Sequence, residues 1–130
     1  MQIAGVDLYV NHPCMALGSP DWIPDDLKLD GKPAASSDTH VILRVQPQTD
    51  LIKVRLFRDH GEGVATDSSF TTVLDQTLYL ADRRLAIGDV MGESRFVKYV
   101  GGPQRWRARI SVDSPDGYAR AVDVVLRPEN

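Results

Sequence analysis

Hydrophobic and polar residues alternate along most of this chain, and the clearest alternation runs from Arg105 to Asp113. Every second residue is apolar and those between are polar, in the order Arg105, Trp106, Arg107, Ala108, Arg109, Ile110, Ser111 and Val112. Because successive side chains of a β-strand point to opposite faces, the segment is predicted to be a strand with one buried and one exposed face. A one-sided strand needs a second layer over its apolar face, so the pattern predicts a two-layered protein.

Seven more segments have the alternation or composition of strands and are separated by turn-forming residues: Ile3–Val10, Thr39–Gln46, Leu51–Arg58, Phe70–Leu80, Leu85–Val90, Arg95–Val100 and Ala121–Arg127. Eight short strands at fairly regular spacing, with no helical pattern, are typical of a sandwich or barrel. We therefore expect an all-β fold with little or no helix, in which residues 1–130 form a single antiparallel two-sheet β-sandwich. The strands Thr39–Gln46 and Leu51–Arg58, joined by the short turn Pro47–Asp50, are predicted to form a hairpin.

The longest interruption of the pattern is the segment 18–38, which holds three prolines and two glycines. So many residues that break regular structure predict a long loop with no more than one helical turn. Long loops are uncommon in compact domains and often carry function, although some only cover the edge of a sheet. Trp22 and Ile23 are expected to anchor this loop to the core.

Charge is distributed unevenly over a chain whose formal net charge is −3. Residues 7–38 hold six aspartates and two lysines, a net charge of −4, whereas residues 83–109 hold seven basic and two acidic residues, a net charge of +5. The overall acidity argues against general nucleic-acid binding, which needs a strongly basic face. The asymmetry either neutralises itself within the fold or presents a charged surface to a partner.

Cys14 is the only cysteine in the sequence, so the chain can form neither an internal disulfide nor a cysteine-based zinc site. This composition fits a reducing compartment. The first residues lack the basic and apolar regions of a secretion signal, and no apolar run approaches the roughly 20 residues of a membrane span. A soluble, cytoplasmic protein without a cofactor and without membrane contact is therefore expected.

The three arginines of the Arg105–Asp113 strand form the most specific surface feature, and we call Arg105, Arg107 and Arg109 the arginine ladder. Three guanidinium groups in a row repel one another unless carboxylates or the anions of a ligand face them. One interpretation is a strip that recognises an anionic surface, for example an acidic protein partner. The other is pairing across strands within the sheet, with Asp123 or Asp89 as the partner.

Two groups of residues come nearest to a catalytic or metal-binding cluster: Asp59-His60-Gly61-Glu62, and His12 with Cys14. No HExxH pair and no nucleophile elbow accompanies them. A polar hairpin tip explains the first group, and a small buried apolar side chain explains Cys14. We therefore predict no catalytic residues and no metal site, and the chain is not expected to be an enzyme.

Aromatic residues outside the clearest strand offer a platform for sugars, formed by Trp22, Tyr9, Tyr79, Tyr99 and Tyr118. Aromatic residues make up only 7% of the chain, so burial in the core is the favoured interpretation of these side chains.

From about Phe70 onward the predicted elements follow one another in a distinctive order. A strand ends in a turn, a Leu-x-Ile strand follows, a Gly-Pro turn leads into an aromatic-Arg-x-Arg strand, and a short apolar strand ends in proline: Thr77–Asp82, Leu85–Ile87, Gly102–Arg109 and Val124–Pro128. In this order the C-terminal half resembles the small bacterial β-sandwich proteins similar to the competence protein J family, the inhibitor of the DNA-entry nuclease. The resemblance implies a non-enzymatic protein that binds and blocks another protein, such as a nuclease or a toxin.

Two hypotheses about function follow. The first is a protein-binding module of the inhibitor or immunity type, in which an acidic surface faces the basic site of a nuclease or toxin. Its predicted partner-binding residues come from the 18–38 loop and the arginine ladder: Asp21, Trp22, Asp25, Asp26, Asp30, Arg105, Arg107 and Arg109. The alternative is a β-sandwich that binds a small ligand or carbohydrate through Trp22 and Tyr118. No direct nucleic-acid contact is expected, and no feature of the sequence indicates an oligomeric state.

Overall fold

The computed structural model describes residues 1–10, 12–46, 51–61, 63–64, 68–90 and 95–129. Within these residues the chain forms ten β-strands and no helix. The strands are β1 (Gln2–Leu8), β2 (Cys14–Gly18), β3 (Ala34–Ser36), β4 (His40–Arg44), β5 (Ile52–Arg58), β6 (Thr71–Tyr79), β7 (Arg84–Asp89), β8 (Arg95–Tyr99), β9 (Arg105–Val112) and β10 (Ala121–Pro128).

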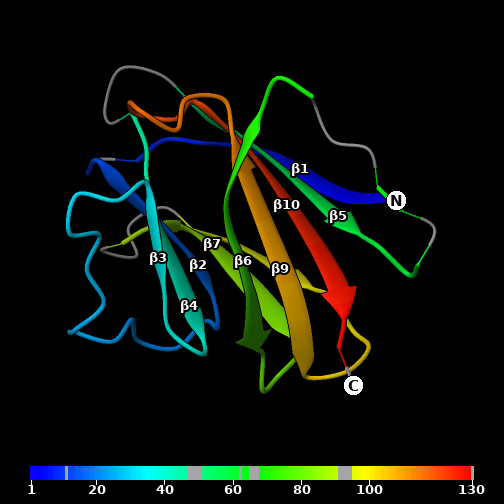
Figure 1. Cartoon of the computed structure of the whole chain (residues 1–130). Helices are drawn as coiled ribbons and strands as arrows, with labels where there is room; N and C mark the ends of the chain where they lie inside the picture. Colours follow the sequence, from blue (N-terminus) through cyan, green and yellow to red (C-terminus); the bar gives the residue numbers. More distant parts are fainter. Residues whose placement is uncertain (11, 47–50, 62, 65–67, 91–94, 130) are drawn as a thin grey trace.

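The strands form two five-stranded sheets that face each other (Figure 1). In the order of neighbouring strands, sheet A is β1-β5-β10-β9-β6 and sheet B is β3-β4-β2-β7-β8. Neighbouring strands are antiparallel with one exception, since β10 runs parallel to β5 with Val124 opposite Leu56. The prediction of an all-β, two-sheet fold is confirmed, and the prediction that the sheets are antiparallel is wrong for this one pair.

The predicted hairpin between Thr39–Gln46 and Leu51–Arg58 is wrong. β4 lies in sheet B between β3 and β2, whereas β5 lies in sheet A between β1 and β10. The predicted turn 47–50 lies outside the described residues, but the strands on its two sides belong to different sheets. Both segments were therefore predicted correctly as strands, and their pairing was not.

Two strands were not predicted, because neither has a clear alternation. β2 is a short apolar run in which every residue after Cys14 is buried, and a strand buried on both faces does not alternate. β3 has three residues and lies within the predicted loop 18–38. Both belong to sheet B, where they flank β4.

The core lies between the two sheets and contains the inward-facing residues of the strands. In β9 these are the four apolar residues of the predicted buried face, each at most 2% exposed. The largest of them, Trp106, donates a hydrogen bond from Nε1 to the carbonyl oxygen of Pro103 at 2.9 Å, as a buried indole N–H requires. The described residues contain no helix long and apolar enough to cross a membrane.

Candidate functional site

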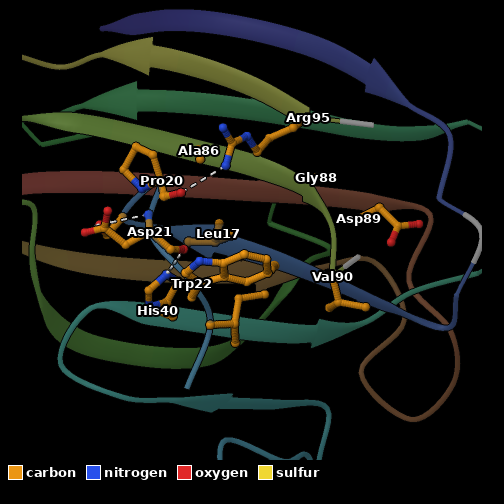
Figure 2. A pocket seen from close by; sticks show the side chains of 14 residues that line it. Leu17, Pro20, Asp21, Trp22, His40, Ala86, Gly88, Asp89, Val90 and Arg95 are labelled. Carbon is orange, nitrogen blue, oxygen red and sulfur yellow. Dashed lines mark hydrogen bonds between the residues drawn. The ribbon is translucent and has the colours of Figure 1, made fainter. Parts of the chain in front are cut away.

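A groove of about 540 Å³ lies on the outer face of sheet B (Figure 2). Its floor consists of small residues of β2 and β7, which pair Ala16 with Gly88 and Gly18 with Ala86. The residue between the two small ones in each strand points into the core. Because each outward position carries only a methyl group or a hydrogen atom, the surface of the sheet is hollow here. The short sequences Ala-Leu-Gly and Ala-Ile-Gly therefore create the groove.

The chain leaves the floor of the groove at Gly18, where only glycine fits. The φ angle of Gly18 is 141°, and a Cβ atom at this position would lie 2.2 Å from the carbonyl oxygen of Thr39. The close approach allows the amide of Ser19 to donate a hydrogen bond to the same oxygen at 2.9 Å. The following residues, 19–22, then turn back over sheet B.

Two side chains hold the segment 19–22 against sheet B, as the dashed lines in Figure 2 show. Nε2 of His40, in β4, donates to the backbone oxygen of Asp21 at 3.0 Å. Nη1 of Arg95, in β8, donates to the backbone oxygen of Pro20, also at 3.0 Å. The Asp21 carboxylate accepts a hydrogen bond from the Ser19 hydroxyl at 3.0 Å. Polar contacts from two strands thus fix the loop, in place of the apolar anchor that the sequence predicted.

Trp22 lines the groove while 96% of its surface is exposed (Figure 2). The prediction that Trp22 anchors the loop to the core is wrong, whereas Ile23 is half-buried and also lines the groove. An indole ring loses a few kcal/mol when it stays in water instead of being buried, so its exposure on an anchored loop needs a reason. The predicted aspartates of the same loop are exposed as well: Asp21, Asp25, Asp26 and Asp30.

Asp89 lines the groove on the side away from Asp21 (Figure 2) and pairs with His12. Nδ1 of His12 lies 3.2 Å from the Asp89 carboxylate. The Asp89 side chain is 0% exposed, and the His12 side chain is 43% exposed.

Burial, together with the charge of Asp89, raises the pKa of the Cys14 thiol to about 11, although a backbone hydrogen bond at Leu43 lowers it. The thiol therefore stays protonated at neutral pH and is no activated nucleophile.

The loop after β5 holds the other predicted cluster. The Asp59 carboxylate accepts hydrogen bonds from the amides of Gly61 at 2.8 Å and Gly63 at 3.2 Å, and it pairs with Arg127 at 3.3 Å. The hydrogen bond from Gly61 is the main reason that the pKa of Asp59 is lowered. Glu62 lies outside the described residues. Among the residues that the structure describes, no group of three or more His, Cys, Asp and Glu side chains could hold a metal ion.

The arginine ladder lies on the outer face of sheet A, where two of its members form ion pairs. Nε of Arg107 donates to Asp75 at 2.7 Å, and Nη2 of Arg105 lies 3.4 Å from Glu129. The hydrogen bond to Asp75 raises the pKa of Arg107 further above its usual value. Pairing across strands within the sheet, one of the two interpretations, therefore holds for Arg107, whereas Arg105 pairs with the residue that follows β10. Arg109 makes no ion pair within the described part of the chain.

The partners suggested for the ladder, Asp123 and Asp89, were wrong. Asp123 is buried and accepts two hydrogen bonds from Arg55, at 2.8 and 2.6 Å, while Asp89 pairs with His12. The ladder borders a second groove of about 440 Å³, which shares no residue with the groove on sheet B. The predicted acidic and basic residues thus belong to two separate surfaces.

The prediction that the remaining aromatic residues are buried is also wrong. Tyr9, Tyr79, Tyr99 and Tyr118 are between 41% and 65% exposed. They do not gather around Trp22, since none of them lines its groove. The ring of Tyr118, which the ligand-binding hypothesis placed beside Trp22, lies instead under the guanidinium of Arg44 at 5.9 Å.

Comparison with solved structures shows a match over almost the whole chain. ComJ from Bacillus subtilis, described as the inhibitor of the DNA-degrading activity of NucA, superimposes with a TM-score of 0.68 over 99% of this chain and 98% of its own. The chain shares the fold of ComJ. The crocagin biosynthetic gene J protein superimposes with a TM-score of 0.64 over 98% of this chain and 97% of its own. Sequence identity is 13% in both cases.

The similarity to ComJ confirms the resemblance found in the C-terminal half and extends it to the N-terminal half, which includes β2 and the loop beside the groove. No protein-family model and no curated protein matches the sequence. At 13% identity the likeness to ComJ is one of fold, so the site has to be argued from the residues of this chain.

The groove was not predicted from the sequence, although a signal for it was present. Residues 16–18 and 86–88 each place a small residue on both sides of a large apolar one, which marks a strand face without bulk. His40 and Arg95 were not among the residues singled out from the sequence. Their role as loop anchors depends on backbone oxygens of Asp21 and Pro20, which lie far from them in the sequence.

Proposed function

We propose that this protein is a non-enzymatic, inhibitor-type binding module that blocks a basic nuclease or toxin. The observation that carries the proposal is Trp22, which is 96% exposed at a groove while the loop that bears it is fixed from β4 and β8. Tryptophan is among the residue types most enriched where a few side chains dominate the energy of a protein interface. The description of ComJ as a nuclease inhibitor supports the choice of a nuclease as the partner.

The aspartates near Trp22 define the chemistry of the partner. Asp21, Asp25, Asp26 and Asp30 lie exposed in the same loop. A protein that binds DNA phosphates carries basic side chains at its site, so an acidic surface complements it. Such complementarity mainly raises the association rate and the specificity, while burial of the indole ring supplies affinity. The groove offers room for a side chain of the partner beside the ring.

Inhibition of DNA cleavage tests this proposal. The purified protein is titrated into NucA, and into the DNA-degrading activity of a lysate of its own host, while the loss of a fluorescent duplex DNA is followed. We expect at least one activity to fall at a stoichiometric ratio, and the variant Trp22→Ala to weaken the inhibition roughly 30-fold or more. If no DNA-degrading activity responds to the protein, the nuclease assignment is overturned.

A matched pair of double variants tests the charge of the loop. Asp25→Asn with Asp26→Asn should slow association and flatten its salt dependence, because both residues lie in the acidic loop. Asp7→Asn with Asp116→Asn removes the same charge at two exposed positions outside the loop and should leave the association rate nearly unchanged. An equal loss for both pairs would show a general effect of net charge and would refute the role of the acidic loop.

The volume of the groove favours binding of a small ligand or carbohydrate as a second function. About 540 Å³ lies within the range of roughly 300–1,000 Å³ that is usual for small-molecule sites. Because Trp22 lines the groove, a ligand there should change its fluorescence, and Trp22→Phe should abolish that change. No change across a panel of sugars and anionic metabolites would dismiss this function without affecting the first.

A further inference from the structure

Two arginines, Arg58 and Arg83, lie at the end of the sandwich where β5 ends. Two connections between the sheets also cross there. The turn between β6 and β7 contributes Arg83, and the turn between β8 and β9 contributes Gly101 and Gly102. Arg58, the last residue of β5, continues the series of inward-facing residues of that strand. Neither groove described above includes any of these residues.

The guanidinium of Arg58 has an unusual environment. It lies over the ring of the buried Trp106, with 5.5 Å between Cζ and the ring centre. Among the buried side-chain nitrogen and oxygen atoms of the described residues, its Nε is the one without a hydrogen-bond partner. No carboxylate in the described part of the chain pairs with Arg58. A partly buried cation is normally paired, because removing it from water is costly.

Arg83 and the two glycines complete the cluster. Nε of Arg83 donates to the backbone oxygen of Gly102 at 2.9 Å, and within the described residues this arginine also has no carboxylate partner. A Cβ atom on Gly102 would lie 3.5 Å from Nη2 of Arg58, so the turn and the guanidinium are neighbours. Arg83, Gly101 and Gly102 all have positive φ angles, of 61°, 68° and 63°. Non-glycine residues with a left-handed backbone are strained, and such residues cluster at functional sites.

We propose that Arg58 and Arg83, with the Gly101–Gly102 turn between them, bind a phosphate group. Two guanidinium groups without carboxylate partners carry a charge of +2, which matches a tetrahedral dianion, and guanidinium groups hydrogen-bond to phosphate oxygens in pairs. The glycines leave the approach to the two side chains free of Cβ atoms. The ring of Tyr99, 65% exposed, lies beside Gly101 and borders the site. This site is independent of the acidic loop and of the proposed function.

Trp106 provides the signal for a binding test. The chain has two tryptophans, so the variant Trp22→Phe leaves Trp106 as the only one, with Arg58 stacked on its ring. Inorganic phosphate is titrated into this protein, with glycerol 1-phosphate in a second series, and sodium chloride keeps the ionic strength constant. We expect a saturable change of Trp106 fluorescence. Tighter binding of the ester would indicate a phosphorylated small molecule as the natural source, and tighter binding of inorganic phosphate would indicate the free ion.

Three further variants, each made in the Trp22→Phe protein, identify the residues. Arg58→Gln should abolish the response, and Arg83→Gln should weaken binding roughly tenfold or more. Arg84→Gln is the control, because Arg84 is the next residue along and is already paired with Asp82 at 2.8 Å. Since Arg83 and Arg84 are both exposed, these two proteins should fold even if Arg58→Gln does not. A response that does not saturate, or one that is equal in the Arg83→Gln and Arg84→Gln proteins, overturns the proposal.

Discussion

The replacement Gly18→Ala tests whether close contact with the backbone of Thr39 and His40 requires glycine at position 18. The new Cβ atom would lie 2.2 Å from the Thr39 oxygen and 2.8 Å from Cα of His40, and both are backbone atoms that move only with the strand. A residue with a Cβ atom at a φ angle of 141° is strained by about 1–3 kcal/mol, and forced overpacking costs about 1–3 kcal/mol more. Weakening the hydrogen bond from Ser19 to Thr39 removes about 1 kcal/mol.

We therefore expect Gly18→Ala to lower the free energy of unfolding by about 5 kcal/mol. For a domain of 130 residues each kcal/mol corresponds to roughly 4 °C in Tm, so Tm should fall by roughly 20 °C. Equilibrium unfolding in urea, followed by circular dichroism, measures the first quantity, and a thermal scan measures the second.

Gly31→Ala is the control, because Gly31 has a φ angle of 79° and nothing lies within 4 Å of the position of its Cβ atom. This variant has the backbone strain without the collision and should lose about 1 kcal/mol. If Gly18→Ala loses no more stability than Gly31→Ala, the collision has no energetic weight and the requirement for glycine at position 18 is refuted.

Three more experiments have outcomes that the structure predicts. Trp106→Ala should lower the free energy of unfolding by about 3–5 kcal/mol in urea titrations, because a fully buried ring and its hydrogen bond are lost; a loss below about 1 kcal/mol would contradict the assigned burial. The hydrogen bonds from Gly61 and Gly63 and the charge of Arg127 lower the pKa of Asp59. The Asp59 carboxylate therefore stabilises the fold at any pH above its unfolded-state pKa. This stabilisation disappears as the pH falls through the folded-state pKa. The stability difference between the wild type and Asp59→Asn should therefore shrink in acid, and a pH-independent difference in urea titrations would count against the pairing. Cys14, with a pKa raised to about 11, should react slowly with iodoacetamide at neutral pH and faster only in alkaline solution, whereas rapid labelling at neutral pH would show that the thiol is not protected.

The strands themselves were predictable because their cause is local. The alternation from Arg105 onward depends only on which side chains avoid water, and β9 has the buried face that it predicts. On the opposite face Arg105 and Arg107 are exposed, whereas Ser111 is buried. Pairing depends on positions far apart in the sequence, so the same rule could not show that β4 and β5 belong to different sheets. β2 was missed because it is buried on both faces and has no alternation.

Trp22 and Asp21 were named as candidate site residues from the sequence, but the groove that they line was not predicted. The sequence rule that aromatic residues are buried placed Trp22 in the core, whereas polar anchors from His40 and Arg95 fix the loop without it. The pair of His12 and Asp89 joins residues 77 positions apart, and no local pattern indicates such a contact. For the same reason the carboxylates that pair with the arginine ladder were not found.

The parallel pairing of β10 with β5 has a consequence for how the protein is made. β10, residues 121–128, is the middle strand of sheet A, and it enters between β5 and β9. Before residues 121–128 are synthesised, β1 and β5 can pair with each other and β6 with β9, but no strand joins these two pairs into one sheet. Until β10 is available, the edges of β5 and β9 stay unpaired, and unpaired strand edges are prone to aggregation. Sheet A is therefore complete only once β10 has inserted, and a parallel, non-local pairing of this kind is slow to form.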